Sequence, residues 1–255
     1  MKKISAHIVS TLFLLLASFS DAKNELQRLS SALRTIAQPP SKVTQISNGT
    51  YKLISTDKKK VTVTFKTGDM LEEGAEAVVD AANATLGAGG GVSELLKNKA
   101  IEYAQAKGKN ISNMISYWNQ GKPHDFSLGK AWLNPNQYVR VYDKNKKNIM
   151  RIIHTVGPNC SNNDDANKVY DAYKNSVIEA RKNNIKSIAF PLISIGIFKC
   201  PANKITSLAV NAIFDEILSG GGAGSLSKIS VVAYGSNKTN EKLLISAAEK
   251  YRKGR

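Results

Sequence analysis

Two glycine-rich loops are the segments of this sequence best suited to chemistry. The first, Gly87–Gly91, runs into a stretch of helical spacing that begins near Val92, and the second, Ser194–Phe198, precedes Pro201, a favourable first-turn residue for a helix. Glycine lets a backbone approach a ligand closely, and free N–H groups at a helix N-terminus attract an anion. Either loop alone could be only a tight turn. The two together favour a diphosphate held from both sides.

Other nucleotide-binding motifs fit the first loop poorly. A P-loop ends in Gly-Lys-Ser/Thr, whereas this loop ends Gly91-Val92-Ser93 without a lysine. The dinucleotide-binding fingerprint places a third glycine where Val92 stands. It also needs an acidic residue at the end of a second strand, which the helical stretch after Val92 does not provide.

Strand and helix patterns mostly alternate along the chain, which indicates a mixed sheet with helices on both faces. Asn48-Gly49 predicts a hairpin between the first two strands. We expect strands over residues 43–46, 51–55, 61–65, 77–81, 131–133, 138–142, 150–155, 187–190 and 229–233. We expect helices over residues 92–107, 166–183, 201–218 and 240–251.

The distinctive polar and glycine-containing segments all follow predicted strands. In open α/β sheets, ligands bind beyond the carboxyl ends of the strands, so these segments are expected to meet at one edge of the sheet. They are Asp69-Met70, Asn83 with the first loop, Gly157-Pro158, the second loop, and Tyr234.

In their order, these segments resemble the motifs of the macrodomains, the ADP-ribose-binding Macro or Appr-1''-p processing family, and are closest to the coronaviral and MacroD types. The matching segments are Gly68-Asp69-Met70, Asp80-Ala81-Ala82-Asn83, Gly89-Gly90-Gly91-Val92, His154-Thr155-Val156-Gly157-Pro158 and Ser194-Ile195-Gly196-Ile197-Phe198. The resemblance runs from about Val43 to the C-terminus. It implies that residues 43–255 form a three-layer α/β/α macrodomain with a mixed central sheet.

The resemblance also implies a role for each matching residue. Asp69 and the Met70 backbone would read adenine, on which Tyr234 would stack, and Asn83 and Phe198 would contact the distal ribose. Simpler interpretations are a turn residue for Asp69, a strand-end aromatic for Tyr234 and a core residue for Phe198. His154 is interpreted as a strand histidine rather than a catalyst. The full implied ADP-ribose-binding set is Asp69, Met70, Ala81, Asn83, Gly89, Gly90, Gly91, Val92, Ser194, Ile195, Gly196, Ile197, Phe198 and Tyr234.

Many macrodomains cleave the bond between the distal ribose and a modified carboxylate, which requires a positioned water and stabilised positive charge. In MacroD-type hydrolases an aspartate follows the valine of the glycine run; here Ser93 stands there, with Glu94 next. Coronaviral-type hydrolases also lack that aspartate. We expect Asn83 and Phe198 to serve catalysis. Glu94 is a candidate substitute acid, or a residue that favours the helix dipole.

Asp80 also departs from the family, which usually has asparagine at this position. A carboxylate lacks the amide donors and adds negative charge near a diphosphate site. It would either weaken ligand binding or face away from the ligand.

Three hypotheses follow, in decreasing order of preference. The first is a hydrolase that removes mono-ADP-ribose from modified protein carboxylates. The second is a reader that binds ADP-ribose without turnover. The third is a non-specific binder of poly(A) or other nucleic acid, which the net charge of +16 would attract. No cofactor is expected, and a monomer is the expected state.

The N-terminus is typical of an export signal. Lys2 and Lys3 precede an apolar stretch over residues 8–19, and small residues follow, so cleavage is expected before Asp21 or Lys23. The stretch is shorter than the roughly 20 residues of a spanning helix, although an uncleaved anchor is the alternative. We therefore expect a signal peptide over 1–22, a short helical extension over 23–42, and a secreted or periplasmic protein that does not associate with the membrane after cleavage.

The cysteine and histidine content limits the other chemistry. Cys160 and Cys200 are the two cysteines, and an exported protein can form one disulfide from them. No zinc spacing can be built from these and three histidines, so no metal site is expected.

Overall fold

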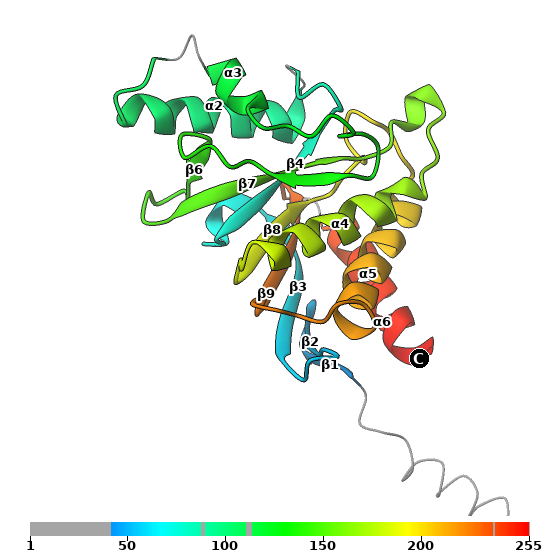
Figure 1. Ribbon diagram of the computed structural model, residues 1–255. Helices are drawn as coiled ribbons and strands as arrows, with labels where there is room; N and C mark the ends of the chain where they lie inside the picture. Colours follow the sequence, from blue (N-terminus) through cyan, green and yellow to red (C-terminus); the bar gives the residue numbers. More distant parts are fainter. Residues whose placement is uncertain (1–41, 88–89, 111–113, 237, 255) are drawn as a thin grey trace, which may run out of the picture. The chain divides into compact units, whose positions relative to one another are not determined.

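A mixed β-sheet runs through the centre of the protein in the computed structural model (Figure 1). The structure describes residues 42–87, 90–110, 114–236 and 238–254. The expected signal peptide and the expected extension, apart from residue 42, lie outside the described residues. Residues Lys42–Arg255 form one compact unit by their contacts. In the part of the chain that is described, no helix has the length and apolar character needed to cross a membrane.

The central strands of the sheet are parallel and its outer strands are antiparallel. The order is β1-β2-β3-β9-β8-β4-β7-β5, with β6 also paired to β7. Pairing is parallel from β3 to β7 and antiparallel at both ends. The strands are β1 Val43–Ser47, β2 Thr50–Ile54, β3 Lys60–Gly68, β4 Ala77–Ala82, β5 Ala131–Leu133, β6 Arg140–Tyr142, β7 Ile149–Val156, β8 Ser187–Pro191 and β9 Lys228–Tyr234.

The central strands are apolar on both faces, as expected for a parallel sheet covered by helices. Because successive side chains point to opposite faces, neighbouring residues enter different cores. Val79 and Ile153 belong to one hydrophobic cluster, whereas Val78 and Ile152 belong to the other. The two clusters therefore lie on opposite faces of the sheet, with β4 and β7 between them.

The helices form two layers, one on each side of the sheet (Figure 1). Helices α4 (Lys168–Lys182), α5 (Ala202–Leu218) and α6 (Thr239–Gly254) pack on the first cluster. Helices α2 (Gly91–Ala106) and α3 (Met114–Asn119) pack on the second. The predicted three-layer α/β/α fold is thus confirmed, as is the hairpin at Asn48-Gly49.

The structure also contains short elements that the periodicity did not predict. They are α3 and two single-turn 3-10 helices, η1 (Met70–Glu72) and η3 (Cys160–Asn162). Some strand boundaries differ from the predicted ones: β6 begins at Arg140 rather than Tyr138, and β3 ends at Gly68 rather than Phe65.

A buried ion pair joins α4 to α5. Arg181 lies 2.7 Å from Glu216, and their side chains are 19% and 3% exposed. Arg181 also donates to the Gly222 carbonyl at 2.9 Å, and Glu216 accepts from the Gly221 amide at 3.3 Å. The pair therefore fixes the glycine-rich connection between α5 and β9 as well as the two helices.

Replacing Glu216 with alanine should lower the free energy of unfolding by about 3–5 kcal/mol, because the Arg181 charge is left buried without its partner. The matched control is Glu102→Ala, which removes the exposed Lys99–Glu102 pair and should cost no more than about 1 kcal/mol. Urea unfolding followed by circular dichroism measures both values. Equal losses of unfolding free energy in the two variants would contradict the stabilising role of the Arg181–Glu216 pair.

Candidate ligand-binding site

The distinctive segments follow the carboxyl ends of the parallel strands and therefore lie at one edge of the sheet. Gly68 at the end of β3 is paired with Tyr234 at the end of β9, and Pro191 of β8 is paired with Val232. Ala82 of β4 is paired with Val156 of β7. The segments that follow these strands are consequently neighbours, as the order of motifs led us to expect.

The two glycine-rich loops face each other at this edge. A Cβ atom on Gly90 would lie 2.7 Å from Ile197 Cδ1, and one on Gly91 would lie 3.6 Å from the same atom. Gly91 has φ +66°, a left-handed conformation that favours glycine. The side chain of Ile197 is 61% exposed. Of the first loop, Ala88 and Gly89 lie outside the described residues.

Helix N-termini follow both loops without a capping side chain. Gly90 is the N-cap of α2, and Pro201 is the N-cap of α5. Pro201 thus lies one residue earlier than the first-turn position expected from the sequence. Because neither N-cap residue makes a side-chain cap hydrogen bond, each helix begins without the usual side-chain acceptor for its first N–H groups.

The second loop is strongly bent and is fixed at its start. Ser194 has φ +71°, and its carbonyl accepts a hydrogen bond from the Cys200 amide at 3.0 Å. Tyr173 of α4 donates to the Pro191 carbonyl at 2.9 Å and accepts from the Ile193 amide at 3.2 Å. Burial raises the pKa of the Tyr173 phenol, which therefore stays protonated and able to donate.

Ser194, the first residue of this loop, carries a buried hydroxyl. Ser194 is only 6% exposed, and its Oγ has no hydrogen-bond partner among the described residues. This hydroxyl packs against Gly157 inside the fold.

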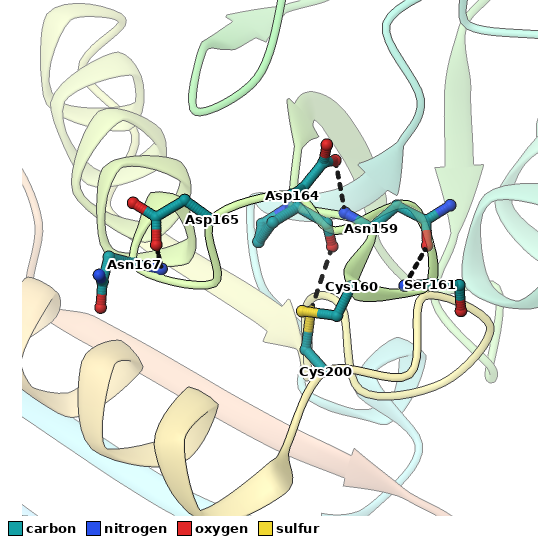
Figure 2. Close-up of a disulfide and its surroundings, with 8 residues drawn as sticks. Asn159, Cys160, Ser161, Asp164, Asp165, Asn167 and Cys200 are labelled. Carbon is teal, nitrogen blue, oxygen red and sulfur yellow. Dashed lines mark hydrogen bonds between the residues drawn. A yellow bond between two sulfur atoms is a disulfide. The ribbon is translucent and has the colours of Figure 1, made fainter.

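The segment after β7 packs tightly against the second loop. A Cβ atom on Gly157 would clash with Ser194 Oγ and with Ile193 Cγ2, so only glycine fits at this position. Three residues later, Cys160 donates its amide hydrogen to the Phe198 carbonyl at 2.9 Å. A disulfide joins Cys160 to Cys200 (Figure 2). The sequence allowed this bond, and the structure places it directly beside the second loop.

At the opposite end of the edge, Asp69 and Tyr234 come from neighbouring strands. Asp69 caps η1, and its Oδ1 accepts from the Leu71 amide at 2.9 Å. Tyr234 is 76% exposed, whereas the side chain of Met70 is buried. A hydrogen bond to Glu72 raises the pKa of Lys144, and the nearby Asp69 and Tyr234 act in the same direction. Sequence reasoning did not identify Lys144.

Asn83 is held in one orientation just after β4. Its side-chain oxygen accepts from Thr85 Oγ1 at 2.8 Å and from the Gly87 amide at 3.1 Å. The oxygen is thus engaged within the first loop, and the NH₂ group is the donating end of the side chain.

Asp80 faces the core rather than the ligand edge. It is completely buried, and its Oδ2 lies 2.7 Å from His154 Nδ1 and 3.4 Å from Ser93 Oγ. This resolves the two alternatives that the sequence left open. It also supports the interpretation of His154 as a strand histidine, because the ring is buried and hydrogen-bonded.

The hydrogen-bond network fixes the tautomer of His154. Asn134 accepts from the Asn136 amide at 3.0 Å and donates to the Trp118 carbonyl at 2.9 Å, which sets its amide orientation. Its NH₂ group then lies 3.3 Å from His154 Nε2, which must be the accepting nitrogen. We therefore assign the proton to Nδ1, which donates to Asp80.

The remaining predicted residues lie around the same edge with different exposures. Glu94 is exposed in the first turn of α2, whereas Ser93 is buried beside Asp80. Gly196 is exposed. The half-buried residues are Ala81, Val92, Ile195 and Phe198. Among the described residues, no three histidine, cysteine, aspartate or glutamate side chains gather where they could hold a metal ion.

Comparison with known proteins agrees with this geometry. The family model of the Macro domain matches residues 79–209. An uncharacterised protein of Pyrococcus furiosus is 32% identical over 182 residues, which cover 69% of this chain and 92% of the relative.

Two further relatives have enzymatic names. The ADP-ribose glycohydrolase of Archaeoglobus fulgidus is 30% identical over 158 residues, covering 60% of this chain and 78% of that protein. The O-acetyl-ADP-ribose deacetylase of Salmonella newport is 31% identical over 152 residues, covering 59% and 76%. A variant of the Oceanobacillus iheyensis macrodomain, solved with ADPR, has a TM-score of 0.60 at 20% identity and covers 81% of this chain and 100% of that one. By its motifs, its fold and these matches, this chain belongs to the macrodomain family.

Proposed function

We propose that this protein binds ADP-ribose at the edge formed by the two glycine-rich loops. The observation that carries the proposal is the close approach of these loops at Gly90 and Ile197. A diphosphate needs donors on two sides, and each loop leads to a helix N-terminus. The relatives named for ADP-ribose chemistry support this ligand.

The other parts of ADP-ribose have suitable partners on either side of the loops. Tyr234 presents an exposed ring for stacking on adenine, and Asp69 directly follows the neighbouring strand β3. Asn83 and Phe198 flank the loops and would contact the distal ribose. The buried Asp80 does not oppose the phosphates at the surface, because its carboxylate is hydrogen-bonded to His154 inside the fold.

Replacing Tyr234 with alanine should weaken ADP-ribose binding by roughly three- to tenfold, because base stacking contributes about 0.5–1.5 kcal/mol. The control is Ile149→Ala, since Ile149 is also an exposed apolar side chain but begins β7 at the opposite edge of the sheet. Isothermal titration calorimetry gives both affinities. A Tyr234→Ala protein that binds as tightly as the wild type would contradict the adenine position.

We also propose that the protein hydrolyses mono-ADP-ribose from modified carboxylates. Water adds to the anomeric carbon of the distal ribose, the bond to the carboxylate oxygen breaks, and ADP-ribose, a carboxylate and a proton are released. The NH₂ group of Asn83 can orient the ribose or the water but cannot accept that proton. The proton acceptor is then one of two groups: a phosphate oxygen of the substrate, or the Glu94 carboxylate of the protein.

Asn83→Ala should reduce the rate of ADP-ribose release about a hundredfold, the usual effect of removing one well-placed donor. The test is single-turnover release of label from a mono-ADP-ribosylated protein. Glu94→Gln is the companion variant: a comparable loss would assign Glu94 as the proton acceptor, and wild-type rates would assign the phosphate. Release at the wild-type rate by Asn83→Ala would overturn the role of Asn83.

A reader of ADP-ribose is the second candidate function, and one observation favours it. Ser93 occupies the position directly after Val92 and is hydrogen-bonded to the buried Asp80, so this position offers no acid to the ligand. A reader would bind ADP-ribose in the titration but release no label in the hydrolysis assay. The two experiments together separate these candidates.

We further propose that the protein is exported. The disulfide between Cys160 and Cys200 supports this, because disulfides persist mainly in oxidising compartments. When cells that produce the protein are fractionated, the chain should lie outside the cytoplasm, with a mature N-terminus at Asp21 or Lys23. A full-length chain confined to the cytoplasm would contradict export.

A further inference from the structure

We infer that Cys160 and Cys200 are positioning residues for the phosphate-binding loop, so that affinity for the diphosphate depends on the disulfide between them. This inference rests on the proposed binding of ADP-ribose. It concerns a feature that the binding proposal does not use, because neither cysteine is among the residues proposed to contact the ligand.

The second loop is fixed by different groups at its two ends. At its start, the buried phenol of Tyr173 binds both Pro191 and Ile193. At its end, the Cys200 amide returns to the Ser194 carbonyl at 3.0 Å, which closes the loop upon itself. The disulfide then joins this closing residue to a different part of the chain, 40 residues earlier in sequence.

Two residues of the loop have backbone conformations that need such support. Ser194 has φ +71° and Lys199 has φ +53°, and neither is glycine. Residues with side chains rarely adopt the left-handed region unless the surrounding structure imposes it. Both lie within the segment that Tyr173 and the disulfide delimit.

The segment that carries Cys160 has its own local hydrogen bonds. Figure 2 shows Asp164 accepting from the Asn159 amide at 2.8 Å, and Asn159 accepting from the Ser161 amide at 3.1 Å. Earlier in the same segment, Gly157 packs directly against Ser194. The disulfide therefore attaches a bent loop to a segment that is hydrogen-bonded within itself and packed against Ser194.

Breaking the disulfide removes the covalent part of this attachment and leaves the hydrogen bond from Cys160 to the Phe198 carbonyl. A loop that is already in its binding conformation binds more tightly, because it loses less conformational freedom on binding. The loss of affinity should concern the parts of the ligand that Ser194–Phe198 would hold, which are the phosphates and the distal ribose. It should spare the adenine end, which Asp69 and Tyr234 supply from other strands.

The chemistry of opening the bond is ordinary thiol–disulfide exchange with a dithiol such as dithiothreitol. Cys160 is half-buried and Cys200 is 4% exposed, so the reagent thiolate attacks the Cys160 sulfur and Cys200 leaves as a thiolate. The second thiol of the reagent then displaces Cys160. Two electrons pass to the protein, which gains two thiols, and the reagent becomes a cyclic disulfide.

The binding experiment compares oxidised protein with protein reduced by dithiothreitol. We expect ADP-ribose affinity to fall about tenfold on reduction, and adenosine affinity, measured by ligand-observed NMR, to stay within about twofold. The Cys160→Ala/Cys200→Ala variant is the matched control, and its affinity should equal that of reduced protein with or without dithiothreitol. Equal ADP-ribose affinity in all three proteins would overturn the inference.

Hydrogen exchange separates positioning from a general loss of structure. In reduced protein that keeps its circular dichroism spectrum, exchange should accelerate at the amides of 193–199 and stay unchanged in the first loop at Leu86 and Gly87. Uniform acceleration over the whole domain would assign the disulfide a purely structural role and overturn the inference.

A second measurement does not require the reduced protein to stay folded. Because a ligand held by Ser194–Phe198 would suppress local opening of this loop, saturating ADP-ribose should slow reduction of the native disulfide about tenfold, whereas saturating adenosine should not. Equal reduction rates with and without ADP-ribose would overturn the inference but leave the binding proposal intact. Oxidised protein that does not bind ADP-ribose would overturn both.

Discussion

Parallel pairing of the strands from β3 to β7 is the constraint on which the rest of the structure depends. Because these strands point the same way, each connection to the next element leaves from one edge of the sheet. Helices α2 and α5 follow β4 and β8, so their N-termini open at that same edge. The two glycine-rich loops face each other for this reason, and burial on both faces of the sheet keeps their spacing fixed.

The sequence was sufficient to predict most of the fold because the long elements have strong periodicity. The strands of the central sheet are apolar and bounded by turns, and the four long helices repeat their apolar residues at helical spacing. Helix α3 has only six residues, and η1 and η3 have three each, too few to show a period. Their positions depend on tertiary packing, as the burial of Trp118 in the second cluster illustrates.

The candidate site was likewise predictable from the sequence only in part. Loop positions could be predicted because each motif follows a strand, but the supports behind the loops could not. Tyr173 reaches Ile193 across 20 residues, and Asp80 reaches His154 across 74. The sequence contains one signal of the disulfide. Cys160 lies two residues after Pro158, and Cys200 lies two residues after Phe198, so both cysteines adjoin motifs that are expected at the same edge of the sheet.

The contact between Asp80 and Ser93 joins the position that differs from the usual family asparagine to the position where MacroD-type motifs have an aspartate. Their side chains lie 3.4 Å apart in the interior. An aspartate at position 93 would set a second carboxylate beside the first, and two buried like charges at this separation cannot both ionise. An ionised acid at position 93 would therefore require a neutral residue at position 80.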